Sequence, residues 1–249
     1  STLASCAATA TSGEVCIAHL GASDGDPSGF ADLRERFATS NPGYDVEFHR
    51  ASSELGAAEG DRVLFVQSGE SEARAATSES ALAVGDIVLL RAGESLSTSA
   101  PFDFVAFTVR DPLPAELPTF IRPDWDPLIT DTPGGCATEE GAYRRILITW
   151  LEANGPYVYH GLNAHRVRIS DSFTHYHPLD GGFDEFYLVQ MVQPEARVLT
   201  GTAVDAIEDR SVSAAEAPNL LTAHRLDVGD LVYLPRGTIP EASTACSLR

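Results

Sequence analysis

The sequence predicts an all-β protein with two antiparallel β-barrels in tandem and a short N-terminal helix. Three observations support this prediction. Short apolar segments separated by turn residues recur through most of the 249 residues, as in an antiparallel sandwich or barrel. A proline-rich stretch without periodicity interrupts the series near its middle. A similar phrase occurs on each side of this interruption, which indicates duplicated domains. A single β-sandwich with an irregular N-terminal extension is the alternative.

The composition is that of an ordinary soluble globular protein. Hydrophobic residues make up 43% of the chain, and the formal net charge of −19 comes from 36 acidic and 17 basic residues. Such a surface repels nucleic acid and anionic membranes, so we expect neither as a partner. No apolar run is long enough for a transmembrane helix. We expect a small molecule as the partner instead.

The cysteines and the first residues bear on the cellular compartment. Four cysteines are spaced too irregularly for a zinc knuckle or a disulfide scaffold: Cys6, Cys16, Cys136 and Cys246. The segment Leu-Ala-Ser-Cys at 3–6 resembles a bacterial lipobox, but no basic or apolar leader precedes it. We therefore expect a bacterial cytoplasmic protein, with a lipoprotein or periplasmic location as the alternative.

The first half of the chain begins with a helix and continues with strands. The helix is predicted over residues 26–40, because Asp26 can cap it, Pro27 suits its first turn, and apolar residues recur on one face. Asn-Pro-Gly at 41–43 ends it. Strands are then expected at 45–49, 62–67, 86–90 and 102–109.

The second half repeats the strand pattern after the proline-rich stretch. We predict an N-terminal barrel over 1–110, a linker over 111–135 and a C-terminal barrel over 136–249. Strands of the C-terminal barrel are expected at 143–150, 157–159, 165–169, 173–177, 185–191, 196–200 and 230–234. The shared phrase aligns residues 82–93 with residues 226–237, with a Gly-Asp turn, an apolar strand and a later glycine in register.

The stretch that carries the chemistry contains His175, His177 and Glu185. Side chains alternate along a β-strand, so the two histidines point to the same side. Glu185 opens the next apolar strand beyond a turn at 180–182, and a hairpin there brings its carboxylate beside the imidazoles. Two histidines and one carboxylate leave positions open for water, dioxygen or a chelating substrate, which suits Fe, Mn or Ni as the divalent metal, with Zn also possible.

With these residues the chain resembles the cupin superfamily. The first cupin motif is a His-x-His pair, a Glu and a later Gly, and the second is Gly-Asp, a strand, Pro-x-Gly and a third His. Both motifs fit the C-terminal half over 145–240, and the second fits the N-terminal half in degenerate form. The resemblance implies a bicupin, with two tandem cupin-type (jelly-roll) barrels.

Three departures from the cupin motifs bear on the site. The gap between His177 and Glu185 is longer than usual, so Asp184 or Asp180 could be the ligand instead. Val192 stands where the Gly of the first motif is expected, and Pro240 stands where the third His is expected.

The C-terminal residues from Pro240 onward do not read as a barrel strand. When they are back-translated with GC-rich codons, one inserted base gives His-Arg-Gly-Val-Asp-Gly-Val-Leu-Ala-Gln, which continues the cupin pattern with the missing histidine. We therefore hypothesise a one-base deletion that truncates the C-terminal barrel.

Further residues of the C-terminal half are candidates for the pocket. Tyr187 shares the face of Glu185 by its spacing, and His160 and His165 lie just upstream of the metal motif. In the N-terminal half, His49 stands alone on its strand, Arg62 takes the approximate place of the carboxylate, and Leu96 falls where a third histidine is expected. That barrel should hold no metal, and bicupins suggest for it a structural or homodimer-forming role.

The resemblance implies an enzyme in which the metal binds a small oxygen-bearing molecule. A dioxygenase is narrowly preferred, because two histidines and one carboxylate suit Fe(II). A sugar isomerase, an epimerase or a lyase of the cupin type is the alternative, and the sequence points to no catalytic residue beyond the metal ligands. A non-catalytic module that binds a carbohydrate or other small ligand is the competing class.

Overall fold

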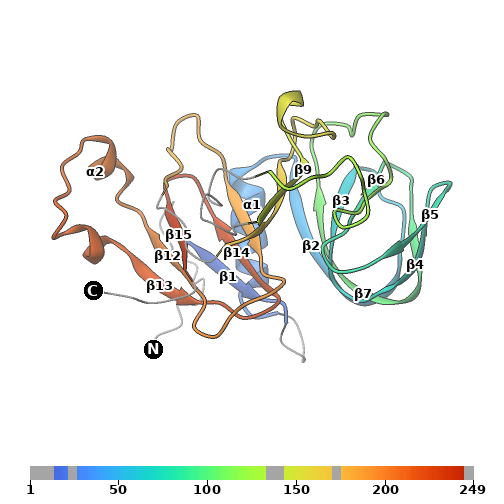
Figure 1. The fold of residues 1–249 in the computed structure, drawn as a ribbon, viewed down its shortest axis with the longest axis horizontal. Helices are drawn as coiled ribbons and strands as arrows, with labels where there is room; N and C mark the ends of the chain where they lie inside the picture. Colours follow the sequence, from blue (N-terminus) through green and yellow to red (C-terminus); the bar gives the residue numbers. More distant parts are fainter. Residues whose placement is uncertain (1–13, 22–26, 133–142, 170–174, 244–249) are drawn as a thin grey trace. The chain divides into compact units, whose positions relative to one another are not determined.

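The computed structural model describes residues 14–21, 27–132, 143–169 and 175–243. Its regular structure is mostly antiparallel strand (Figure 1), which confirms the predicted all-β class. The described α-helices are α1 (Phe30–Ser40), which lies within the predicted range 26–40, and the short α2 (Val204–Glu208). No helix among the described residues has the length and hydropathy that a membrane crossing needs.

The chain forms two compact units that are not consecutive in sequence. The N-terminal unit consists of Phe37–Gly134 and Tyr143–Arg168. The C-terminal unit consists of Ser1–Arg36, Gly135–Ala142 and Ile169–Arg249. Each unit therefore includes a segment from the opposite half of the chain. The ranges 1–110, 111–135 and 136–249 stay a prediction as domain boundaries.

The N-terminal unit is built on one seven-stranded sheet in the order β5-β4-β7-β3-β6-β8, with β2 paired to β7. Its strands are β2 (Asp45–Leu55), β3 (Arg62–Ser68), β4 (Ser71–Ala75), β5 (Ser78–Leu82), β6 (Ile87–Leu90), β7 (Leu96–Thr108) and β8 (Phe120–Ile121). A separate pair joins β9 (Tyr143–Ile148) to β10 (Ala164–Arg168), with the 3-10 helix η1 (Glu152–Asn154) between them. All of these strand pairs are antiparallel.

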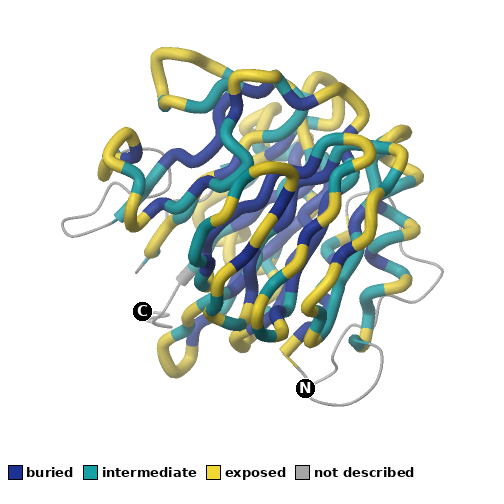
Figure 2. The backbone as a smooth tube through the Cα atoms, turned by 90° about the vertical axis from the view of Figure 1, so that its right-hand side faces the viewer, coloured by how far each residue is buried: buried dark blue, intermediate teal, exposed yellow. Residues whose placement is uncertain are grey.

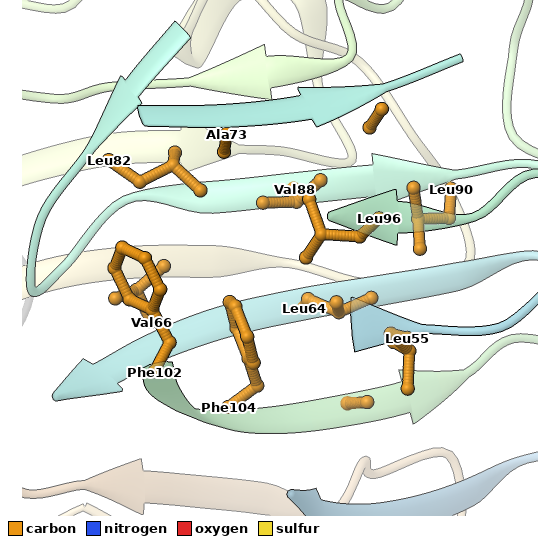
Figure 3. Close-up of a cluster of buried hydrophobic side chains, with 12 residues drawn as sticks. Leu55, Leu64, Val66, Ala73, Leu82, Val88, Leu90, Leu96, Phe102 and Phe104 are labelled. Carbon is orange, nitrogen blue, oxygen red and sulfur yellow. The ribbon is translucent and has the colours of Figure 1, made fainter. Parts of the chain in front are cut away.

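Apolar side chains fill the inner face of this sheet (Figure 3). The cluster draws on β2 to β7, and its labelled members are Leu55, Leu64, Val66, Ala73, Leu82, Val88, Leu90, Leu96, Phe102 and Phe104. Burying a side chain of the Leu or Phe type contributes about 1.5–3 kcal/mol, so this face is a major source of stability. Figure 2 shows the buried positions running along the strands and the exposed ones gathering in the connections.

The described residues of the proline-rich stretch, 111–132, are packed into the N-terminal unit. Four of its apolar residues belong to a second buried cluster: Leu113, Leu117, Ile121 and Ile129. The Asp61 carboxylate accepts a hydrogen bond from the Leu113 N–H (2.6 Å). The prolines exclude a long strand here, but the apolar residues between them still find a core.

The described residues of the C-terminal unit form two three-stranded sheets. The first has the order β1-β14-β11, from β1 (Cys16–His19), β14 (Asp230–Leu234) and β11 (Glu185–Leu188). The second has the order β13-β12-β15, from β13 (Thr222–Arg225), β12 (Arg197–Gly201) and β15 (Ile239–Ser243). Helix α2 and the 3-10 helix η2 (Ala217–Leu220) lie between β12 and β13 in the chain. Val198, Val232 and Leu234 are buried together, with Ile17 and Tyr187 packed against them.

The strand β15 corrects one expectation. Residues from Pro240 onward were not expected to form a barrel strand, yet Ile239–Ser243 pairs with β12. The reason is the direction in which a backbone N–H at position 240 would point. Its carbonyl accepts the His175 N–H (3.3 Å), and in an antiparallel pair the N–H of a residue points to the same neighbour as its C=O. The missing N–H of proline therefore costs a bond on that side alone and leaves the pairing with β12 intact.

Two other predicted strands differ from the structure. Within 157–159, Val158 makes an isolated bridge to Thr149. Of 173–177, residues 173 and 174 lie outside the described residues, and 175–177 runs beside β15 without regular strand geometry.

The phrase shared by the two halves folds into the same turn in both units. Gly85 and Gly229 have φ angles of 91° and 90°, which favour glycine. Asp86 Oδ2 accepts the Ala83 N–H (2.9 Å), as Asp230 Oδ2 accepts the Asp227 N–H (2.8 Å). The turn leads into β6 in one unit and into β14 in the other, so the two strands are equivalent.

Candidate metal site

The candidate ligands come from a segment beside β15 and from the start of β11. The His175 N–H donates to the Pro240 carbonyl (3.3 Å), and the His177 N–H donates to the Thr238 carbonyl (2.9 Å). This extended backbone places the two imidazoles on the same side, as their spacing predicts. Glu185 is paired with Leu234 of β14, whose side chain belongs to the buried cluster of this unit. Glu185 therefore faces the interior.

The three side chains converge. Glu185 Oε2 lies 3.6 Å from His175 Nε2 and 3.1 Å from His177 Nε2. One ligand atom from each residue can be chosen so that all three lie within 4.8 Å of one another. Among the residues that the structure describes, this is the one group of three or more His, Cys, Asp or Glu with such an arrangement.

The hydrogen bonding of His177 directs its Nε2 atom at the Glu185 carboxylate. Its Nδ1 lies 3.1 Å from the Phe183 carbonyl oxygen, which can only accept, so Nδ1 carries a proton. In a neutral imidazole Nε2 is then an unprotonated acceptor. It faces the Glu185 carboxylate at 3.1 Å, and two acceptors repel at that distance. Either a second proton on His177 or a metal ion removes the repulsion. The donor set therefore fits a divalent metal.

Glu185 is held in its charged form. Burial raises the pKa of its carboxyl, but hydrogen bonds with His175 and His177 outweigh burial and lower the pKa to about 2. The side chain of His177 is 3% exposed, whereas that of Glu185 is 28% exposed. The site thus offers an anionic oxygen that remains charged at neutral pH and is open on one side.

Asp184, the alternative ligand, is engaged elsewhere. Its Oδ2 accepts the Tyr233 hydroxyl proton (2.7 Å), and its Oδ1 accepts both the backbone N–H and the Nε–H of Arg236 (2.9 and 3.0 Å). The carboxylate is 4% exposed. Asp180, the other alternative, is exposed. The geometry therefore favours Glu185 as the ligand.

Pro240 stands where the cupin motif has a third histidine. It lies directly opposite His175 and is buried. Proline has no side-chain donor atom, so the strand β15 supplies nothing to the cluster at this position.

The N-terminal unit shows what replaces the ligands in the equivalent barrel. Arg62 is paired with Leu90 of β6 as Glu185 is paired with Leu234 of β14. The Arg62 side chain is buried and donates from Nη2 to the carbonyls of Gly56 (2.7 Å) and Glu94 (3.1 Å). A fixed cation thus occupies the place of the carboxylate and repels a metal ion.

The positions of the other two ligands are also changed in that unit. The Gly93 N–H donates to the Ala58 carbonyl (2.9 Å), as the Gly237 N–H donates to the His177 carbonyl (2.7 Å). This correspondence puts Ala58 in the place of His177 and Gly56 in the place of His175. His49 lies instead on β2 opposite Phe104, with its Nε2 3.4 Å from Glu47 Oε2.

The remaining predicted pocket residues fall in different places. Tyr187 lies on the inner face of β11 and packs against the buried cluster of the C-terminal unit, as its spacing from Glu185 predicts. His160 and His165 are exposed and belong to the N-terminal unit. Their part in the pocket stays a prediction.

Sequence reasoning missed one polar pair of the same barrel. Thr200 of β12 and His224 of β13 lie within hydrogen-bond distance of each other, at 2.9 Å. His224 lies two residues before the segment 226–237, as Ser80 lies two residues before the segment 82–93. Extending the repeat backward would have drawn attention to His224, but not to its contact with Thr200.

No protein-family model matches the sequence, and no curated protein matches it either. Solved structures that resemble it include AerE from Microcystis aeruginosa, at 11% identity over 81% of this chain and 80% of that one, with a TM-score of 0.49. An IolB-like protein from Salmonella typhimurium has 17% identity over 82% and 78%, with a TM-score of 0.47. A cupin 2 conserved barrel domain protein from Leptotrichia buccalis has 10% identity over 96% and 86%, with a TM-score of 0.41. The likeness is one of fold.

Proposed function

We propose that the C-terminal unit binds one divalent metal through His175, His177 and Glu185, and that the protein is a metal-dependent enzyme acting on a small oxygen-bearing molecule. The observation that carries this proposal is the convergence of three donor atoms within 4.8 Å of one another on the inner face of a β-barrel. The Nε2 atom of His177 faces the carboxylate without a proton of its own in the neutral ring.

Two imidazoles and one carboxylate give a divalent metal complex a net charge of about +1, with coordination positions left open. Such a centre attracts an anionic or chelating substrate and can polarise its oxygen atoms. The fold supplies the rigid support, since Glu185 begins a paired strand and the two histidines are hydrogen-bonded to the backbone of Pro240 and Thr238.

A dioxygenase is the first candidate reaction. The set of two histidines and one carboxylate is the one that non-haem Fe(II) oxygenases use. This narrower proposal requires that the protein bind iron and that substrate turnover consume dioxygen. An isomerase, epimerase or lyase requires neither, so an oxygen electrode separates these classes.

The first test is the metal content of the purified protein, measured by plasma mass spectrometry after reconstitution with Fe(II), Mn(II), Ni(II) or Zn(II) in turn. We expect about one equivalent in the wild type and none in the double variant His175→Ala, His177→Ala. The double variant His160→Ala, His165→Ala is the matched control, because it removes two exposed histidines from the other unit. It should keep its metal.

One observation favours a binding module without catalysis. Pro240 removes a donor from the site, and a centre with fewer protein ligands binds its metal more weakly. A wild-type protein that retains no metal under any of these conditions would contradict the enzyme proposal and favour the binding module.

A further inference from the structure

A second polar pair lies on the inner face of the barrel that holds the candidate ligands. The Thr200 hydroxyl oxygen is 2.9 Å from His224 Nε2, and Thr200 is 5% exposed. Val198 lies two residues before Thr200 and directly opposite His224. Because Val198 is buried with Val232 and Leu234, Thr200 and His224 face the same interior.

Strand pairing connects this pair to the candidate metal site. Thr200 lies opposite Pro240 of β15, and Pro240 lies opposite His175. Residues directly opposite each other in antiparallel strands point to the same face, so His175, Pro240 and Thr200 form one row. Two strand spacings separate the ends of the row, which is about 10 Å between backbones. The row therefore places Thr200 on the same interior face as His175, two strands away from it.

The N-terminal unit provides an internal comparison. It has the same strand pairings, but Ala75 takes the place of Thr200 and Ser80 takes the place of His224. The same unit has replaced all three candidate metal ligands. Thr200 and His224 are thus both replaced in the unit whose equivalents of the three candidate metal ligands are also replaced. This pattern is expected if the two groups serve one substrate.

The protonation of His224 suits a proton acceptor. Burial lowers its pKa from the ordinary value, because an imidazolium is costly to desolvate. The side chains of β12 that face it, Val198 and Thr200, carry no charge. His224 is therefore neutral at pH 7, and its Nε2 can accept the proton of the Thr200 hydroxyl.

We propose that Thr200 and His224 form a proton-transfer pair for a small 2-oxo acid held at His175, His177 and Glu185. This inference rests on the metal centre of the proposed function. A 2-oxo acid carries two neighbouring oxygen atoms that can chelate a divalent cation, and its negative charge complements a centre of charge about +1. The hydrogen on the carbon beside its carbonyl is acidic and can be removed by a base.

The step balances without an oxidant. The C3–H bond of the 2-oxo acid breaks, and its electron pair stays on the substrate. The Thr200 oxygen takes this proton while its own hydroxyl proton passes to His224 Nε2. Return of a proton to the substrate restores both residues, and no electron leaves the site. This proton transfer consumes no dioxygen, so it can be measured separately from the dioxygenase reaction of the proposed function.

The test uses the full chain reconstituted with Zn(II) and 2-oxobutyrate as the probe. Exchange of the C3 hydrogens in D2O is followed by proton NMR, and zinc content is measured on the same samples. Thr200→Ala and His224→Ser are the variants, because they install the residues of the N-terminal unit. We expect each to bind about one equivalent of zinc and to exchange at least about 100-fold more slowly than the wild type.

A second readout does not depend on turnover. In the metal-free protein, nitrogen NMR of the His224 ring should show an Nε2 that accepts a hydrogen bond, and Thr200→Ala should shift this resonance.

The outcomes separate the two proposals. Zinc binding without exchange in the wild type overturns the 2-oxo acid and leaves the metal centre standing. Exchange that both variants retain overturns the role of the pair. A wild type that binds no zinc overturns the metal centre on which this inference rests.

Discussion

Asp184 and Glu185 are neighbours in the chain, but their carboxylates have different surroundings. Glu185 faces the two histidines, whereas Asp184 is buried against the Tyr233 hydroxyl and Arg236. These hydrogen bonds fix the residue just before the ligand. Replacing a group that orients a metal ligand typically lowers metal affinity by about 10–100-fold. We therefore expect Asp184 to act as a positioning residue for the candidate metal site.

We predict that Asp184→Ala weakens metal binding by about 10-fold and lowers the free energy of unfolding by about 1–3 kcal/mol, since it removes a buried carboxylate that accepts hydrogen bonds from Tyr233 and Arg236. Metal titration and denaturant unfolding measure the two effects. Tyr233→Phe is the control, because it removes one of these hydrogen bonds and leaves both bonds to Arg236. An Asp184→Ala protein that binds metal as tightly as the wild type would show that the network has no part in the site.

The candidate metal ligands could be predicted because their pattern is local. Alternation along an extended segment and a turn before Glu185 are both visible in the sequence. Thr200 and His224 could not be found in this way, because their relation depends on pairing between β12 and β13. The choice between Asp184 and Glu185 also required the fold, since both are acidic and adjacent. Strand pairing decides which one faces the interior.

At the scale of single elements, β1 is the least expected. Cys16–His19 pairs with β14 near the other end of the chain, and the sequence predicted no strand there. Ile17 packs against the buried cluster of the C-terminal unit, while Cys16 and Ala18 are fully buried. A four-residue strand gives too short a pattern to predict. Its stability comes from the partner strand.

We predict that Ala18→Asp destabilises the C-terminal unit by about 3 kcal/mol or more, because it places a charge at a position with 0% exposure. Thermal unfolding with and without metal is the measurement, and the loss should include the metal site, since β14 also pairs with the strand that carries Glu185. Ala115→Asp makes the same change at an exposed position and should stay within about 0.5 kcal/mol of the wild type. Equal stability of the two variants would contradict a structural role for β1.

The elements that the sequence missed share a physical cause. Strands β4, β5 and β13 are short and rich in Ser, Glu, Arg and Thr, so they lack a clear apolar alternation. They form because neighbouring strands pair with them. The prediction for β15 was wrong for a different reason. Pro240 argued against a strand, but at this position the strand needs no backbone N–H donor toward β12. The apolar strands β3, β6, β11, β12 and β14 all lie where the pattern predicted them.

At the scale of the whole molecule, the two units interlock in sequence. The N-terminal unit includes β9 and β10 from beyond the proline-rich stretch, and the C-terminal unit includes β1 from the start of the chain. The duplication that the similar segments 82–93 and 226–237 indicate is visible in the equivalent turns at Gly85 and Gly229. The repeat does not predict that β9 and β10 belong to the N-terminal unit and β1 to the C-terminal unit. A repeat shows which strands correspond to each other, but it does not show which unit a strand outside the repeat joins.

We predict that neither half of the chain folds stably when expressed alone. Residues 1–134 lack β9 and β10, and residues 135–249 lack β1, which leaves the edge of β14 unpaired. Unpaired strand edges promote aggregation. Size-exclusion chromatography and thermal unfolding of each fragment are the measurements, and the two fragments expressed together are the control, since all the strands are then present. A monomeric 135–249 fragment as stable as the full chain would refute the prediction.

The pairing of β1 with β14 has a consequence for the order in which the protein is made. His19 and Asp230 are 211 residues apart and joined by a 2.8 Å contact. A ribosome adds about 5–20 residues per second, so β1 waits roughly 10–40 s for its partner strand to be synthesised. The N-terminal unit has all of its segments once residue 168 has emerged. The growing chain therefore carries a complete N-terminal unit while β1 still lacks its partner strand β14. A chaperone that covers residues 16–19 during this interval should raise the yield of native protein.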